Sequence, residues 1–137
     1  MENALKVLFI DDDTIEVMKF KRTISKLNLN HTVVEAGNGE EALSILEDKD
    51  QLPDIILLDL NMPKMNGLEF LSILKANDIL RYIPIIVLST SRNYNDILEG
   101  YKHGVAGYML KPLKYEDYVA NVEKTLSYWS MCELIKI

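Results

Sequence analysis

The chain has 137 residues, of which 48% are hydrophobic and 26% are charged, and this balance is typical of one folded domain rather than of a disordered segment. The net charge of -6 disfavours a nucleic-acid-binding surface, which needs a basic stripe. No apolar run approaches the roughly 18 residues of a membrane span, and the N-terminus shows no signal peptide. The single cysteine, Cys132, cannot form an internal disulfide, so we expect a cytoplasmic protein.

Patterns typical of strands and helices alternate from one end of the chain to the other. The expected strands cover residues 6–10, 32–35, 54–58, 85–88 and 104–109, and the expected helices cover 13–27, 40–46, 67–74, 96–102 and 115–129. This alternation predicts an α/β fold with a parallel sheet, right-handed crossovers and helices on both faces. We find no repeat and no linker, so we expect one domain over 1–137 with a short tail, 129–137, and no output domain.

Acidic residues lie where two of the predicted strands end. Asp59 follows the apolar run 55–58, and the acidic residues 11–13 follow the run 7–10. The carboxyl ends of parallel strands form the crevice in which open α/β sheets bind ligands. Crowded carboxylates repel one another unless a cation lies among them, and an all-oxygen site suits Mg²⁺ or Mn²⁺. For Asp13 the favoured alternative is a structural role as the N-cap of the next helix.

Further polar residues follow the last two predicted strands. Ser89 and Thr90 end the run 85–88, and Lys111 follows the run 107–110. The intervals between Asp12, Asp59, Ser89 and Lys111 each span a whole number of strand–helix units. We therefore expect these four residues at the same edge of the sheet. Either Ser89 or Thr90 could instead cap the following helix, and Lys111 could be a solvated surface lysine.

In this combination the chain resembles the receiver domain of two-component response regulators. The matching motifs are Asp11-Asp12, Asp59 within Leu58-Asp59-Leu60-Asn61-Met62-Pro63, Met65-Asn66-Gly67, Ser89-Thr90, Tyr108 and Lys111-Pro112. The resemblance covers residues 6–126 and implies a flavodoxin-like, doubly wound five-stranded sheet with the strand order 2-1-3-4-5. The chain is also similar to the stand-alone receivers of the chemotaxis type and to the small receivers associated with phytochromes.

The resemblance implies a phosphorylation-dependent signalling switch and not an enzyme that turns over a substrate. Asp59 would attack a phosphoryl group as a nucleophile, taking it from a histidine kinase or a histidine phosphotransfer protein. The expected cofactor is Mg²⁺, with Mn²⁺ as a substitute, held by Asp12, Asp59 and the Asn61 backbone carbonyl, with Asp11 acting through water. Output would be by protein–protein contact.

The resemblance also assigns roles to residues of the last two strands. Lys111 would pair with one phosphoryl oxygen, and the Ser89 hydroxyl would donate a hydrogen bond to another. Ser89 and Tyr108 would move together when the phosphoryl group arrives, which makes them a two-state switch. The Lys111–Pro112 peptide bond is expected to be cis.

Three other functions compete with this interpretation. The segment 37–42 matches G-x-G-x-x-A of dinucleotide-binding folds, but Glu40 and Glu41 would repel a pyrophosphate at the start of that helix. A phosphohydrolase of the haloacid dehalogenase type needs an acid two residues after its nucleophile, where this chain has Asn61, which cannot shuttle a proton. A receiver-like docking module would not need both acidic groups and Lys111.

The C-terminal part carries more apolar residues than one helix needs to face its sheet: Tyr118, Val119, Val122, Leu126, Trp129, Leu134 and Ile135. An exposed apolar patch usually marks an interaction surface. We therefore expect a homodimer or a kinase contact through the last strand, the last helix and the tail. The alternative is that Trp129 and Ile135 fold back onto the domain.

Overall fold

The computed structural model describes residues 3–62 and 65–135. Its sheet is parallel throughout and has the strand order β2-β1-β3-β4-β5, which confirms the predicted topology. The strands are β1 (Lys6–Ile10), β2 (Thr32–Ala36), β3 (Ile55–Leu58), β4 (Ile85–Ser89) and β5 (Gly107–Leu110). The helices are α1 (Thr14–Lys26), α2 (Gly39–Leu46), α3 (Gly67–Ala76), α4 (Tyr94–Lys102) and α5 (Tyr115–Met131), with short 3-10 turns at Lys49–Gln51 and Leu80–Tyr82.

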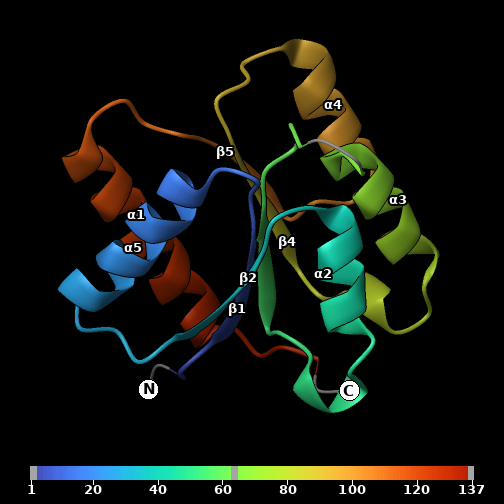
Figure 1. Ribbon diagram of the computed structural model, residues 1–137, viewed down its shortest axis with the longest axis horizontal. Helices are drawn as coiled ribbons and strands as arrows, with labels where there is room; N and C mark the ends of the chain where they lie inside the picture. Colours follow the sequence, from blue (N-terminus) through green and yellow to red (C-terminus); the bar gives the residue numbers. More distant parts are fainter. Residues whose placement is uncertain (1–2, 63–64, 136–137) are drawn as a thin grey trace.

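The sheet lies between two layers of helices, with α1 and α5 on one face and α2, α3 and α4 on the other (Figure 1). Successive side chains of a strand point to opposite faces, so each inner strand serves two cores. On β1, Val7 and Phe9 pack in the core with α1 and α5, whereas Leu8 and Ile10 pack in the core with α2 and α3. Burial on both faces explains why the strand runs are continuously apolar, and the parallel direction of all the strands brings their carboxyl ends to one edge.

Most predicted boundaries differ from the structure by no more than two residues, and the starts of two elements are wrong by two or three residues for a local reason. The last strand begins at Gly107 rather than at 104, because Gly104 has a φ of 83° and turns the chain after α4. Helix α4 begins at Tyr94 rather than at 96, because Asn93 caps it by accepting a hydrogen bond from the Asn95 amide. Neither Ser89 nor Thr90 is therefore the cap of α4, whereas Asp13 caps α1 as predicted.

The predicted apolar patch at the C-terminus is largely wrong. Tyr118, Val122 and Leu126 are buried in the core between the sheet, α1 and α5, and Trp129 and Leu134 pack against the same core. The last turn of α5 is also tied to the other end of the chain, because the Asn3 amide donates to the Ser130 carbonyl. This part of the chain mostly completes its own fold, and among the described residues of α5 and the tail, up to residue 135, the large apolar side chains that stay exposed are Tyr115, Tyr128, Met131 and Ile135.

Candidate functional site

The parallel sheet delivers the predicted polar residues to one edge. Asp11 and Asp12 follow β1, and Asp59 follows β3, which lies beside β1 in the register Ile10↔Leu58. Ser89 is the last residue of β4, and Lys111 follows β5 directly. Backbone hydrogen bonds continue each pairing into the site: the Asp59 amide donates to the Ile10 carbonyl over 2.9 Å, and the Lys111 amide donates to the Ser89 carbonyl over 2.8 Å.

Three carboxylates converge at this edge. Asp11, Asp12 and Asp59 each offer an oxygen, and these oxygens lie within 4.8 Å of one another. Asp11 is buried, Asp59 is half-buried and Asp12 is exposed, so the cluster opens toward solvent on the Asp12 side. Oxygen-only donors are the ligands that Mg²⁺ and Mn²⁺ prefer, and the open side leaves room for water ligands. The residues present therefore fit a divalent cation.

Lys111 is the positive charge of the cluster. Its Nζ lies 3.1 Å from Asp11 Oδ2, and the ammonium side chain is only 9% exposed. A second carboxylate oxygen, Oε1 of Glu16 on α1, lies 3.9 Å from the same Nζ. Burial would lower the pKa of Lys111, but the charges of Asp11 and Asp59 outweigh it and raise the pKa, so the lysine stays charged.

The acidic cluster is electrostatically strained without a cation. Burial raises the pKa of the Asp59 carboxyl from 3.8 to about 6, and the neighbouring charges of Asp11 and Asp12 add to the rise. The Lys111 ammonium and the Asn61 amide, which donates to Asp59 Oδ1 over 3.3 Å, oppose it. Burial likewise raises the pKa of Asp11. The raised pKa values of Asp59 and Asp11 mean that the ionised form of each carboxyl group is destabilised. A bound cation would stabilise the ionised form.

This strain predicts a pH-dependent stability for the metal-free protein. Because the pKa of Asp59 is higher in the folded state than the ordinary 3.8, the contribution of its carboxyl to stability is full below about pH 4 and is lost as the pH rises to about 6. Asp59→Asn removes this loss, so above pH 6 the variant should be more stable than the native chain by about 1–3 kcal/mol. Chemical denaturation from pH 4 to pH 8 in chelator measures the difference; a constant difference across that range would contradict the assignment.

The loop after Asp59 is shaped by a glycine whose role the sequence did not reveal. The Gly67 amide, in the first turn of α3, donates to the Leu60 carbonyl over 3.0 Å. A Cβ at Gly67 would lie 2.6 Å from the Leu60 Cα and 3.0 Å from the Asp59 carbonyl oxygen. Only glycine lets α3 approach the loop this closely, which holds the Asp59 backbone and the exposed Asn61 at the sheet edge.

Ser89 and Tyr108 are linked through a residue that sequence reasoning missed. The buried Ser89 hydroxyl oxygen accepts a hydrogen bond from the Ser91 amide over 3.1 Å. The half-buried Tyr108 hydroxyl donates to the Ser91 carbonyl over 3.0 Å, and the Ser91 hydroxyl donates to Asp96 on α4. The two predicted switch residues therefore hold the same loop, and a change at Ser89 can reach Tyr108 through Ser91.

One predicted feature of the site is wrong. The Lys111–Pro112 peptide bond is trans, as are the other peptide bonds in residues 3–62 and 65–135. The trans form is the preferred one for an X–Pro bond, by about 0.5–1 kcal/mol, and the Lys-Pro motif alone does not determine the isomer.

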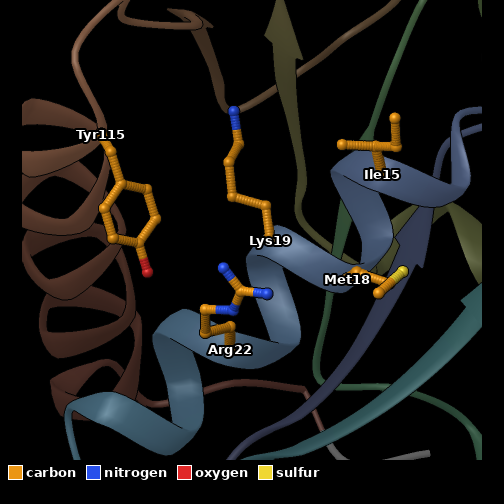
Figure 2. Close-up of a pocket in the computed structure, with 5 residues that line it drawn as sticks. All are labelled: Ile15, Met18, Lys19, Arg22 and Tyr115. Atoms are coloured by element: carbon orange, nitrogen blue, oxygen red, sulfur yellow. The ribbon is translucent and has the colours of Figure 1, made fainter.

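A shallow groove beside the site lies between α1 and α5. Figure 2 shows its lining, which consists of Ile15, Met18, Lys19, Arg22 and Tyr115. Ile15 and Met18 are 71% and 60% exposed although they are apolar, and they lie within the first two turns after the acidic residues. The groove itself holds no carboxylate, so it belongs to the surroundings of the cluster rather than to its chemistry.

The fold and the cluster define a class of protein: a parallel five-stranded α/β domain with acidic residues after β1 and β3 and a lysine after β5. The family model of the response regulator receiver domain matches residues 7–123. The chain therefore belongs to the receiver domain family, whose members act as phosphorylation-dependent signalling switches in two-component systems. No helix in the part of the chain that the structure describes is long and apolar enough to cross a membrane.

Individual relatives share most of their length with this chain. The probable methanogenesis regulatory protein FilR2 of Methanothrix harundinacea is 33% identical over 132 residues, which are 93% of this chain and 85% of FilR2. The crystal structure of the phosphorylated cyanobacterial phytochrome response regulator RcpA superposes with a TM-score of 0.89 at 30% identity, covering 96% of this chain and 99% of RcpA. The Mn²⁺-bound form of response regulator Rcp1 superposes with a TM-score of 0.85 at 28% identity, covering 96% of this chain and 99% of Rcp1.

Proposed function

We propose that this receiver accepts a phosphoryl group on Asp59 from a histidine kinase or a histidine phosphotransfer protein and passes the signal on by changing its protein contacts. The observation that carries the proposal is the convergence of Asp11, Asp12 and Asp59 within 4.8 Å beside the buried Lys111 ammonium. Asp59 is the carboxylate that follows the central strand β3, with acidic neighbours on one side and the lysine within electrostatic reach.

The residues have separable roles in the transfer. An Asp59 oxygen forms the new bond to phosphorus while the bond between phosphorus and the donor imidazole breaks, and the imidazole keeps that electron pair. A divalent cation held by Asp12, Asp59 and the Asn61 backbone carbonyl, with Asp11 acting through water, would neutralise the charge that repels nucleophile from phosphoryl group. Lys111 would pair with one phosphoryl oxygen and the Ser89 hydroxyl would donate to another.

The carboxylates of Asp11, Asp12 and Asp59 repel one another and would repel a phosphoryl group, so the site needs a cation, and we propose that this cation is Mg²⁺. The existence of a Mn²⁺-bound form of the structural neighbour Rcp1 supports binding of a divalent ion by this chain. The raised pKa of Asp59 and the oxygen-only donor set support a hard cation of this kind.

Sustained phosphohydrolase turnover is disfavoured by the residue two positions after Asp59. Asn61 is exposed, and its backbone amide donates to the Asp59 carboxylate. Its side-chain amide neither loses nor gains a proton near neutral pH, so it cannot act as the general acid and base of a hydrolase. The absence of such a group suits a switch, whose autodephosphorylation we propose to be slow compared with enzymatic turnover.

The partner that supplies the phosphoryl group must reach the open side of the cluster. Its phosphohistidine has to approach Asp59 past Asp12, so its surface must touch the elements that begin at this edge, among them α1. The exposed apolar side chains of Ile15 and Met18, beside the groove of Figure 2, lie on that path. The free Cys132 and a kinase as the phosphoryl source support a cytoplasmic location.

A homodimer through α5 and the tail has less to support it than the sequence suggested. In α5 and the tail as far as residue 135, the large apolar side chains still exposed are Tyr115, Tyr128, Met131 and Ile135, and Ile135 is the one member of the set first expected that is among them. Sedimentation velocity at high micromolar concentration, with and without beryllofluoride, distinguishes a monomer from a second copy docked on this surface.

Phosphorylation by a small donor tests the proposal without the unknown kinase. Acetyl phosphate with Mg²⁺ should add one phosphoryl group to the chain, seen as a single mass increment. The adduct should be released by hydroxylamine, because an aspartyl phosphate is an acyl phosphate. Labelling that proceeds equally well in EDTA, or that resists hydroxylamine, would refute an Asp–Mg²⁺ mechanism.

A further inference from the structure

Glu16 is a charged group beside the site that the proposed function leaves without a role. It lies in the first turn of α1, and its side chain is 20% exposed. One of its carboxylate oxygens lies 3.9 Å from Lys111 Nζ, and the other lies 3.1 Å from Lys19 Nζ. Lys111 thus has two carboxylates on its α1 side, with Asp11 at 3.1 Å and Glu16 slightly further away.

The surroundings of Glu16 limit where its carboxylate can go. Lys19, which Figure 2 shows on α1 facing α5, places its Nζ 4.4 Å from the centre of the Tyr118 ring. The Tyr118 hydroxyl is buried and has no hydrogen-bond partner among the described residues. Burial, followed by the charge of Glu16, raises the pKa of this tyrosine, so its hydroxyl stays neutral. Glu16 is therefore held between Lys19 and Lys111.

We propose that Glu16 is a positioning residue that holds the Lys111 ammonium on the α1 side of the site while Asp59 is unphosphorylated. This inference rests on the proposed function, in which Lys111 pairs with a phosphoryl oxygen on Asp59. To do so, Lys111 must move away from its present partners toward Asp59. Glu16 stays behind on α1, so its attraction stabilises the unphosphorylated position of Lys111 more than the phosphorylated one.

Only an interaction that differs between the two positions of Lys111 can shift their populations. Neutralising Glu16 therefore favours the position in which Lys111 contacts the phosphoryl group. Glu16→Gln keeps the shape of the side chain and should raise the affinity for beryllofluoride, a phosphoryl mimic, by about 5-fold at saturating Mg²⁺. Glu16→Asp retains the charge on a shorter side chain and should fall between the native chain and Glu16→Gln.

A double-mutant cycle tests whether the effect passes through Lys111. In a Lys111→Met background, Glu16→Gln should change beryllofluoride affinity by less than 2-fold, because the cation that Glu16 holds is gone. Glu40→Gln is the matched control: it removes one exposed carboxylate near the same sheet edge, from the first turn of α2, with no contact to Lys111. Thermal unfolding of each variant separates a change in affinity from a change in fold.

The outcomes separate this inference from the proposed function. An equal gain from Glu16→Gln with and without Lys111, or an equal gain from Glu40→Gln, would show a general charge effect and overturn the positioning role. A loss of affinity in Glu16→Gln would overturn it as well. Native protein that binds beryllofluoride no better than Asp59→Asn would instead overturn the proposed function, and the positioning role with it.

Discussion

Asp59→Asn should leave the protein folded and unable to take up a phosphoryl group from acetyl phosphate. The amide has nearly the shape of the carboxylate but lacks the nucleophilic oxygen anion, so uptake should fall by more than about 100-fold. The variant removes a destabilised carboxylate whose pKa is raised to about 6, so we expect it to be the more stable protein, and a thermal unfolding measurement separates loss of the nucleophile from loss of the fold.

The measurement is the fraction phosphorylated by intact mass, at matched Mg²⁺ and donor concentrations. Asp78→Asn is a matched control, since it makes the same substitution at an exposed carboxylate outside the cluster and should label as the native chain does. Asp59→Asn protein that still labels at the native stoichiometry would place the phosphorylation site elsewhere.

Asp12→Ala should abolish most of the Mg²⁺ affinity. Asp12 is the exposed member of the cluster, so its carboxylate is free to bind a cation without breaking a buried contact. Loss of this ligand should weaken Mg²⁺ binding on the order of 100-fold. Removing a group that only supports a metal ligand already lowers metal affinity by about 10- to 100-fold, and a direct ligand should matter at least as much. Phosphorylation by acetyl phosphate should fall in parallel, because the charge on the phosphoryl group is then not neutralised.

Isothermal titration with MgCl₂ measures the affinity directly. Asp13→Asn is the sharpest control: it removes the same charge one residue along the chain, and asparagine replaces aspartate as the N-cap of α1 at little cost. If Asp12→Ala and Asp13→Asn weaken Mg²⁺ binding equally, the effect is one of net charge, and Asp12 is not a ligand.

The fold and the chemistry of the site were readable in the sequence because both follow from local patterns. An unbroken apolar run such as 55–58 can be satisfied only by burial on both faces, and alternation with amphipathic helices then requires a parallel sheet. In such a sheet every strand ends at the same edge, so Asp12, Asp59 and Lys111 had to meet there whatever the details of packing. The cap of α1 at Asp13 is equally local.

The tertiary structure alone decided which side chains those residues contact. Glu16 is one of several acidic residues in the sequence, and only the packing of α1 on the sheet beside α5 brings it within 3.9 Å of Lys111. The burial of Tyr118 and Leu126 depends on α5 lying against α1 and the sheet, so an apolar excess in the sequence could not be distinguished from an exposed patch. Gly67 is required because a Cβ at this position would lie 2.6 Å from the Leu60 Cα, a close approach that no sequence pattern encodes. Sequence periodicity determines which face and which edge a residue occupies, whereas distances between residues far apart in the chain depend on how the finished layers pack.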